Sequence, residues 1–306
     1  MGTEGGPTTE PHGAVPASAA TEVGDTAPWV WCGARRLPVD RADASVPPAA
    51  LEPLPDLGTA AQAACAEPIG APRLRELARG ARSVVVTVPD ASRPCPNEPV
   101  LLALLEELAA AGVPDAAVTV AVGCGLHATT DAEGREQLVG PAVTRRVEVV
   151  DAQGIESGTV DLGETTLGAP VRIVRRLAQA DLAVTVGVVE PHLYAGFSGG
   201  VKGVAIGCAG RETIAWTHRP AFISRPGVTV ARLRGNPFQA TLREIAARTP
   251  LAWAVNLVTA GGAAAAVRAG DPAVVQAALA RDAAPKWVRH CSRRYDVVVA
   301  GVPAPK

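Results

Sequence analysis

The sequence predicts an α/β fold with a mostly parallel, Rossmann-like sheet and flanking helices. Short β-branched apolar runs alternate along the chain with longer segments in which apolar residues recur at helical spacing. Strands that are joined through helices run parallel with right-handed crossovers, so the connecting helices cover the faces of the sheet.

The first strand–helix–strand unit begins with SVVVTVP (83–89), a β-branched run of strand length. NEPVLLALLEELAAAG (97–112) follows as a helix, which Asn97 can cap and Gly112 can end. AAVTVAVG (116–123) is the next strand.

The later elements continue this alternation. The expected strands are VEVV (147–150), ADLAVTVGVV (180–189), WAVNLV (253–258) and YDVVVAGV (295–302). The expected helices are VRIVRRLAQA (171–180), RETIAWTH (211–218) and NPFQATLREIAART (236–249), the last with Asn236 as its N-cap and Pro237 in its first position.

Composition divides the chain into three regions. Residues 1–27 hold few large apolar side chains, so they cannot offset their own ordering entropy and are expected to form a disordered tail. Residues 28–285 are expected to form the main domain. Residues 286–306 read as the start of a truncated second domain, because a YDVVVAG strand normally leads to a further loop and helix.

Charge and hydropathy exclude several partners. With 29 basic and 30 acidic residues, a net charge of −1 and no Lys/Arg run, the chain lacks the footprint of a nucleic-acid or anionic-membrane binder. No apolar window reaches the roughly 18 to 20 residues of a membrane span, and no signal peptide is evident. A cytoplasmic protein acting on small molecules is expected. The six cysteines form no CxxC pair and are expected to be scattered buried thiols.

A polar loop follows the first strand directly. It consists of Asp90, Ala91, Ser92 and Arg93. Neighbouring prolines stiffen it, so it should present a carboxylate, a hydroxyl and a guanidinium in a fixed arrangement. Arg93 can grip a carboxylate or phosphate with two hydrogen bonds. The alternative is an Asp turn beside a solvated arginine.

Two histidines lie on loops that follow predicted strands. His127 in VGCGLHATT is flanked by glycine and should be exposed enough to titrate near neutrality, as a proton-transfer residue must. His192 opens the glycine-rich segment EPHLYAGFSGGVKGVAIGCAGRET (190–213), and loops of this kind bind ligands. A lone histidine is more often an ordinary loop residue.

The same glycine-rich segment holds a possible anion site and an unusual lysine. Ser198, Gly199 and Gly200 can turn backbone amides inward as a nest for a phosphate. Lys202 is one of only three lysines in a chain that otherwise uses arginine. An amine can form a covalent bond through its nitrogen, which a guanidinium seldom does. Lys202 could instead be a simple phosphate counter-ion.

His218 lies at the end of the expected helix RETIAWTH and could bind a metal. A neutral imidazole is a common nitrogen ligand for nickel, zinc or copper. Together with His127 and His192 it could form a three-histidine zinc site, so a histidine-metal hydrolase is an alternative. No HExxH or cysteine-based zinc pattern supports that alternative, and no GxGxxG or GxxxxGK[ST] motif supports an ordinary NAD or ATP fold.

Taken together, five motifs resemble the ordered signature of the lactate racemase family. They are DASRP, GLHATT, EPHLYAGFSGGVKG, AGRET with the trailing His218, and GNPF. The resemblance runs from about Trp29 to the C-terminus. It implies that residues 28–285 are a cofactor-binding N-terminal domain of a nickel-dependent isomerase, a racemase or epimerase of a small 2-hydroxy acid such as lactate.

The resemblance also implies roles for the candidate residues. Lys202 would be tethered to a nickel-pincer nucleotide, Ni(II)-pyridinium-3,5-bisthiocarboxylate mononucleotide, which cofactor-synthesis proteins supply, and His218 would bind the nickel. His127 and His192 would be the paired acid/base residues of a proton-coupled hydride transfer. The 90–93 loop would contact the cofactor, with Arg93 also holding the substrate carboxylate.

The sequence departs from the family pattern in three respects. The second domain, which contributes a Gln and a Lys to the substrate site, is largely missing. Ala128 stands where an arginine is usual, and Val201 stands where a basic residue is common. A further alternative is therefore a fragment that binds the cofactor but is inactive or depends on a partner.

Overall fold

The computed structural model describes residues 29–32, 35–38, 51–153, 158–260, 262–287 and 294–299. The chain divides into two compact units, one of residues 1–46 with 293–306 and the other of residues 47–292. In the first unit, β1 (Trp29–Cys32) and β2 (Arg35–Pro38) form an antiparallel hairpin. The expected tail at 1–27 lies outside the described residues, and the expected boundaries at 28, 285 and 286 remain predictions.

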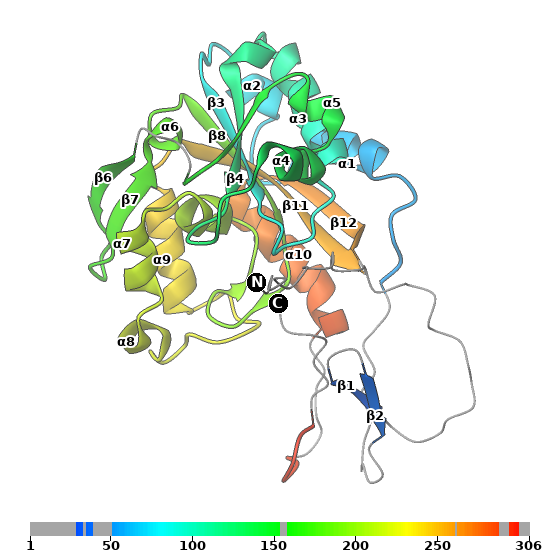
Figure 1. The fold of residues 1–306 in the computed structure, drawn as a ribbon, viewed down its shortest axis with the longest axis vertical. Helices are drawn as coiled ribbons and strands as arrows, with labels where there is room; N and C mark the ends of the chain where they lie inside the picture. Colours follow the sequence, from blue (N-terminus) through cyan, green and yellow to red (C-terminus); the bar gives the residue numbers. More distant parts are fainter. Residues whose placement is uncertain are drawn as a thin grey trace, which may run out of the picture. The chain divides into compact units, whose positions relative to one another are not determined.

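The second unit is built around a six-stranded sheet, as the alternation of strands and helices predicts (Figure 1). In spatial order its strands are β12 (Ala263–Gly270), β11 (Leu251–Ala260), β8 (Leu182–Val188), β3 (Val84–Pro89), β4 (Val118–Gly123) and β5 (Glu148–Asp151). The strands from β11 to β5 pair in parallel, and only β12 pairs antiparallel, along the edge of β11. The predicted mostly parallel α/β fold is confirmed.

Both faces of this sheet are buried, as the continuous apolar runs require. Val84, Val86 and Val88 of β3 point into one core, while Val85 between them points into the other. The first core is covered by α1 (Leu57–Ala66), α2 (Leu74–Leu77) and α3 (Asn97–Ala110). The second is covered by α6 (Arg175–Ala178), the π-helical turn η2 (Gly203–Gly207), α7 (Arg211–Thr217), α8 (Pro220–Ile223) and α9 (Pro237–Ala246).

Shorter elements complete this unit. They are η1 (Asp115–Ala117), α4 (Ala132–Val139), α5 (Pro141–Thr144), the hairpin of β6 (Thr159–Glu164) with β7 (Pro170–Val174), and the small ladder of β9 (Pro191–His192) with β10 (Gly196–Phe197). The last helix, α10 (Pro272–Trp287), packs on β11 and β12. No described helix has the length and apolar composition that a membrane crossing requires.

The order of the strands places a topological switch point between β3 and β8, at the carboxyl ends of the strands. The chain runs outward from β3 through β4 to β5, then returns across β3 to β8 and continues to β11. Loops that leave β3 and β8 at their carboxyl ends therefore diverge to opposite sides. Ligands of open parallel sheets bind in the crevice at such a switch point.

Several expected elements differ from the structure. The helix expected at 171–180 is strand β7 followed by the short α6, because the β-branched residues of PVRIV pair with β6. The strand expected at 295–302 is absent from residues 294–299, and its remaining positions lie outside the described residues. Asn97 does not cap α3: it lies inside the helix and donates from Nδ2 to the Leu138 carbonyl oxygen at 2.8 Å.

The described cysteines agree with the expectation of scattered thiols. Cys65, Cys124 and Cys208 are buried and free, and Cys95 is free and half-buried. Burial raises the pKa of Cys65 and of Cys208 to about 12, so these thiols stay protonated and unreactive near neutrality.

Candidate active site

The predicted site residues gather at the carboxyl edge of the sheet. The 90–93 loop leaves β3, His127 follows β4, and His192 and Lys202 follow β8. The positive charges of Lys202 and Arg93 both act on His192, and Asp90 acts on Lys202, so these side chains form one electrostatic cluster. The structure therefore brings together groups that are up to 128 positions apart in the sequence, from Asp90 to His218.

The 90–93 loop is a tight turn that is organised by its own carboxylate. Asp90 Oδ1 accepts hydrogen bonds from the backbone N–H of Ser92 at 3.2 Å and from Ser92 Oγ at 2.6 Å. This Asx turn leaves Asp90 Oδ2 for a partner outside the loop. The expected fixed presentation of carboxylate and hydroxyl is thus provided by internal hydrogen bonds as well as by the flanking prolines.

An ion pair crosses the switch point of the sheet. Arg93 Nη1 from the β3 loop contacts Oε1 of Glu190, the second residue after β8. Burial lowers the pKa of Arg93, although the nearby Asp90 carboxylate opposes this. The guanidinium remains charged because its unperturbed pKa is above about 12. Arg93 is therefore a partly desolvated cation that is aimed across the crevice.

His127 is exposed, as expected, and is oriented by Asp90. Its Nδ1 lies 2.5 Å from Asp90 Oδ2, and its side chain is 65% exposed whereas that of Asp90 is only 13% exposed. Because a carboxylate only accepts hydrogen bonds, Nδ1 carries a proton and the Nε2 lone pair faces outward. The pair has the arrangement in which a carboxylate holds a histidine ready to accept a proton.

His192 has the opposite proton arrangement. Its Nδ1 accepts hydrogen bonds from the backbone N–H groups of Tyr194 and Ala195, each at 3.2 Å. Backbone N–H groups only donate, so the neutral ring carries its proton on Nε2. Burial lowers the pKa of His192 to about 3, and the charges of Lys202 and Arg93 act in the same direction. His192 is therefore neutral near physiological pH.

This shift predicts a pH dependence of stability. Folded His192 resists protonation down to pH about 3, whereas the unfolded side chain binds a proton below pH 6.5, so acidification through this window destabilises the fold. His192→Asn, in which Oδ1 can replace Nδ1 as an acceptor, should flatten the dependence. We expect the two proteins to diverge by at most about 1.4 kcal/mol per pH unit, reduced by solvent screening.

Urea unfolding of both proteins at intervals from pH 7 to 3.5 measures that difference. The wild-type chain serves as the reference at every pH, which cancels the contribution of other acids and histidines. Parallel curves for the two proteins over the whole range would contradict the assignment of a neutral, buried His192.

His218 is held so that its other ring nitrogen is free. It caps the C-terminus of α7, and its Nδ1 lies 2.9 Å from the Ile214 carbonyl oxygen, which can only accept. Nδ1 therefore carries the proton and Nε2 offers a lone pair. Burial lowers the pKa of His218, and Lys202 adds to this, so the neutral form that binds metals is favoured.

Lys202 lies at the start of the π-helical turn η2, half-buried against the sheet. The pKa of its amine is lowered to about 8, mainly by burial and also by the positive charge of Arg93, while Asp90 opposes the shift. Gly203 lets the turn approach the strands, since a Cβ there would lie 2.5 Å from Thr185 Oγ1. Single π turns are frequent at functional sites. The arrangement yields an amine that is readily deprotonated.

The expected anion nest at Ser198, Gly199 and Gly200 is not formed. The backbone N–H of Ser198 donates to the Glu190 carbonyl oxygen at 2.9 Å, and that of Gly200 donates to Asn256 Oδ1 at 2.6 Å. Two of the three amides are therefore engaged by the protein and do not point toward a ligand. The sequence does not reveal that Asn256 lies beside this loop, and a contact of residues 198–200 with a cofactor remains a prediction.

The three-histidine zinc arrangement is also not formed. Among the described residues, no three His, Cys, Asp or Glu side chains lie close enough to share a metal ion. His192 and His218 instead each contact the same two aromatic rings. Phe238 lies 6.5 Å from His192 and 5.4 Å from His218, and Tyr194 lies 6.0 Å from each, all between ring centroids.

Sequence reasoning assigned no role to several residues that shape this site. They are Glu190, Tyr194, Phe238, Asn256 and Gln276. Glu190 directly follows a strand, and Asn256 interrupts an apolar strand, so both positions carried a usable signal. Tyr194, Phe238 and Gln276 act through packing and hydrogen bonds between distant segments, which no local pattern reveals.

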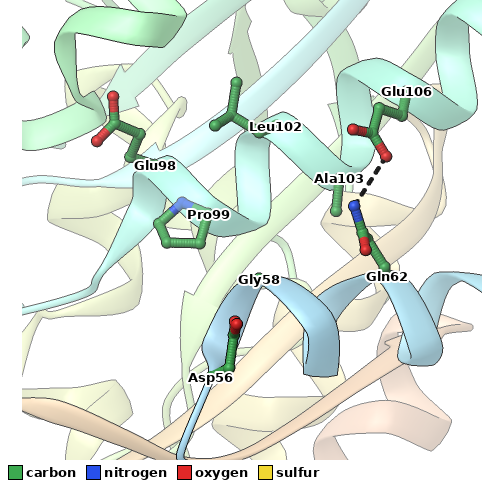
Figure 2. A pocket seen from close by; sticks show the side chains of 8 residues that line it. All are labelled: Asp56, Gly58, Gln62, Glu98, Pro99, Leu102, Ala103 and Glu106. Carbon is green, nitrogen blue, oxygen red and sulfur yellow. Dashed lines mark hydrogen bonds between the residues drawn. The ribbon is translucent and has the colours of Figure 1, made fainter.

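A separate pocket lies between α1 and α3 (Figure 2). It has a volume of about 350 Å³ and is lined by Asp56, Gly58, Gln62, Glu98, Pro99, Leu102, Ala103 and Glu106. Its carboxylates are already used: Asp56 caps α1 through Thr59 N–H, Glu98 accepts from Ala142 N–H, and Glu106 accepts from Gln62 Nε2. None of the predicted site residues lines it, and we assign it no ligand.

Known proteins resemble this chain in both sequence and fold. The lactate racemases of Lactiplantibacillus plantarum and Thermoanaerobacterium thermosaccharolyticum are 33% and 31% identical over 195 and 192 residues. Each alignment covers 62% of this chain and 45% of the racemase, so the chain spans about half the length of these relatives.

Two solved structures share the architecture. The apoprotein of the T. thermosaccharolyticum lactate racemase superposes with a TM-score of 0.74 at 25% identity, covering 83% of this chain and 61% of that one. A crystal structure of a Thermotoga maritima protein, with a TM-score of 0.52 and 20% identity over 70% of this chain and 59% of that one, shows the fold alone.

A family model adds the decisive match. The model described as the lactate racemase N-terminal domain matches residues 35–230, which include every candidate side chain from Asp90 to His218. The match spans well over half of the sequence. The chain therefore belongs to the lactate racemase N-terminal domain family.

Proposed function

We propose that this chain carries the cofactor site of a nickel-dependent racemase or epimerase that acts on a small 2-hydroxy acid. One observation supports the proposal most: a readily deprotonated amine, Lys202, and a histidine with a free Nε2, His218, belong to one electrostatic cluster at the crevice. A covalently tethered nickel nucleotide requires both groups together.

The residues fit a nickel-pincer nucleotide. The neutral Nζ of Lys202 would form a thioamide with a thiocarboxyl group of the nucleotide, in a condensation that releases water. Nε2 of His218 would bind the nickel as a neutral imidazole. Asp90 and Arg93 would line the same cavity. When bound, the nucleotide supplies a reversible acceptor for the hydride on C2 of the substrate.

The two remaining histidines supply an acceptor and a donor of protons. His127 presents the Nε2 lone pair, because Asp90 holds the proton on Nδ1. His192 presents an Nε2–H, because backbone amides occupy Nδ1. His127 would take the hydroxyl proton, and His192 would hydrogen-bond to the developing carbonyl oxygen. For the opposite enantiomer the two roles would be exchanged, which requires the His192 ring to give up its hydrogen bonds from Tyr194 and Ala195 so that its proton can lie on Nδ1.

Arg93 would hold the substrate carboxylate. One of its nitrogen atoms is engaged by Glu190, and the remaining N–H groups of the guanidinium can bind a second carboxylate. The partial burial of Arg93 strengthens such a contact, because a charge pair is weakly screened where water is excluded. One cation for a carboxylate and two imidazoles for a hydroxyl suit a small 2-hydroxy acid such as lactate.

Dependence on a partner is a second candidate, and the coverage of the relatives favours it. The matched segments make up 45% of each racemase, so the rest of those enzymes has no counterpart in the aligned part of this chain. The cofactor-binding part of such an enzyme, taken by itself, would admit water and lack further substrate-positioning groups. The chain would then bind the cofactor and need a second polypeptide for turnover.

Co-expression with cofactor-synthesis proteins tests these proposals. Intact mass should reveal one adduct, metal analysis should give one nickel per chain, and a single enantiomer of lactate should be converted to a racemic mixture. An adduct with nickel but without turnover would favour the partner-dependent form. A preparation from the same co-expression that contains neither adduct nor nickel would overturn both proposals.

A further inference from the structure

Three buried primary amides surround the loop that precedes Lys202. They come from three different elements: Gln239 from α9, Asn256 from β11 and Gln276 from α10. Their exposed fractions are 1%, 0% and 0%. All three positions lie beyond residue 230, where the match to the family model ends.

Each amide is directed at the loop or at another amide. Gln276 Nε2 donates to the carbonyl oxygens of Phe197 at 3.2 Å and Ser198 at 3.1 Å. Gln276 Oε1 accepts from Gln239 Nε2 at 2.9 Å, which fixes the orientation of the Gln276 amide. From strand β11, Asn256 Oδ1 accepts a hydrogen bond from the backbone N–H of Gly200 at 2.6 Å.

Burying these three amide side chains costs free energy if they serve only to pack the core. A buried amide gives up its hydrogen bonds to water, and apolar side chains of similar volume stabilise a core at least as well. Leu279, three positions further along α10, is also 0% exposed and packs without any polar contact. The amides therefore select one loop conformation in preference to adding stability.

The selected conformation sets the backbone that carries the lysine. Gly199 and Gly200 have φ angles of 73° and 55°, in the left-handed region. A Cβ on Gly200 would lie 2.8 Å from Gln276 Cδ, so the loop rests directly on this amide. The backbone N–H of Lys202 donates to the Gly199 carbonyl oxygen at 3.1 Å, which links the loop to the lysine.

We propose that Gln276 is a positioning residue for Lys202: through the carbonyl groups of residues 197–198, and supported by Gln239 and Asn256, it holds the loop so that the amine stays half-buried beside Arg93. The inference rests on the proposed role of Lys202 and adds a residue that contacts neither substrate nor cofactor. Loosening the loop should let water reach the amine, and its nucleophilicity should then fall.

Gln276→Met tests the inference, because Met has nearly the volume of Gln and no hydrogen-bonding amide. The cofactor-free chain is acetylated with trace acetic anhydride at a series of pH values, and peptide mass spectrometry quantifies each lysine. Only Lys202, Lys286 and Lys306 can react besides the N-terminus, so the other two lysines calibrate the reagent. Wild-type Lys202 should show a midpoint at pH about 8.

In Gln276→Met the midpoint of Lys202 should move upward by about one pH unit, a tenfold loss of neutral amine below the midpoint. Leu279→Met, at a buried apolar position of the same helix, is the matched control and should leave the midpoint unchanged. Far-UV circular dichroism establishes that the variants are folded. Gln239→Met removes only the support of Gln276, so it should produce a smaller shift in the same direction.

An unchanged Lys202 midpoint in folded Gln276→Met would overturn the inference. If that variant does not fold, Gln239→Met decides in the same way. The titration uses protein that is expressed without the cofactor. A chain that fails to acquire the nucleotide would refute the proposed function and leave this result untouched, so the two failures are distinguishable.

Discussion

Lys202→Arg is expected to abolish covalent loading entirely. The amine of Lys202 has a pKa of about 8, lowered mainly by burial, so near that pH a large fraction is uncharged and nucleophilic. Arginine keeps the positive charge and much of the length, but its pKa above about 12 leaves no free nitrogen lone pair. Intact mass after co-expression with cofactor-synthesis proteins should show the adduct in the wild type and only the bare chain in the variant.

Lys286→Arg is the matched control for that experiment, because it makes the same replacement at another of the three lysines. It should load as the wild type does. Digestion of the loaded wild-type chain should place the added mass on the peptide that contains Lys202. An adduct that persists in Lys202→Arg would show that the attachment point, and with it the proposed function, has been misassigned.

Phe238→Ala is expected to have the largest effect on stability. The ring is 0% exposed and packs against both His192 and His218. Removing it leaves a cavity, and Phe→Ala changes in cores cost about 3–5 kcal/mol. Water that enters the cavity should also raise the pKa of His192 from about 3 toward 6.5. Urea unfolding measures the first effect, and an NMR titration of the histidine rings measures the second.

Phe222→Ala separates the two effects. Phe222 is 1% exposed and its ring centroid lies 5.9 Å from that of Phe238, so its removal should cost a similar free energy of unfolding. It stacks on Trp216 at 4.7 Å and has no ring contact with either histidine. The pKa of His192 should therefore stay low. Equal histidine titrations in both variants would show that Phe238 does not control the environment of His192.

The sheet could be predicted because each of its central strands is marked by the residues of that strand alone. A β-branched run such as Val84–Pro89, which is buried on both faces, is apolar at every position except Thr87. β12 has no such signal: AAAAVRAG is poor in β-branched residues and becomes a strand only because β11 offers a free edge. The segment 171–174 was misassigned for the related reason that its partner, β6, is itself weakly marked.

Candidate site residues could be identified from the sequence where a residue type is rare in the chain and has a distinctive chemistry. Lysine in a chain of arginines, and histidine after a strand, are visible in the sequence. The three-histidine zinc alternative could not be judged from the sequence, because the distances among the histidines depend on how distant segments pack. Phe238, whose ring contacts both His192 and His218, lies 20 positions beyond His218. The same holds for the anion nest, whose amides are taken by Glu190 and Asn256.

The layer of amides also bears on how a minimal soluble piece of this protein should be designed. A gene cut at residue 230, where similarity to the family model stops, would retain every side chain from Asp90 to His218 but would omit α9, β11 and α10. β8 would then become an exposed edge strand without its partner β11. The Ser198 carbonyl group would lose its hydrogen bond from Gln276 and face solvent. Expression fragments should therefore extend at least through Trp287.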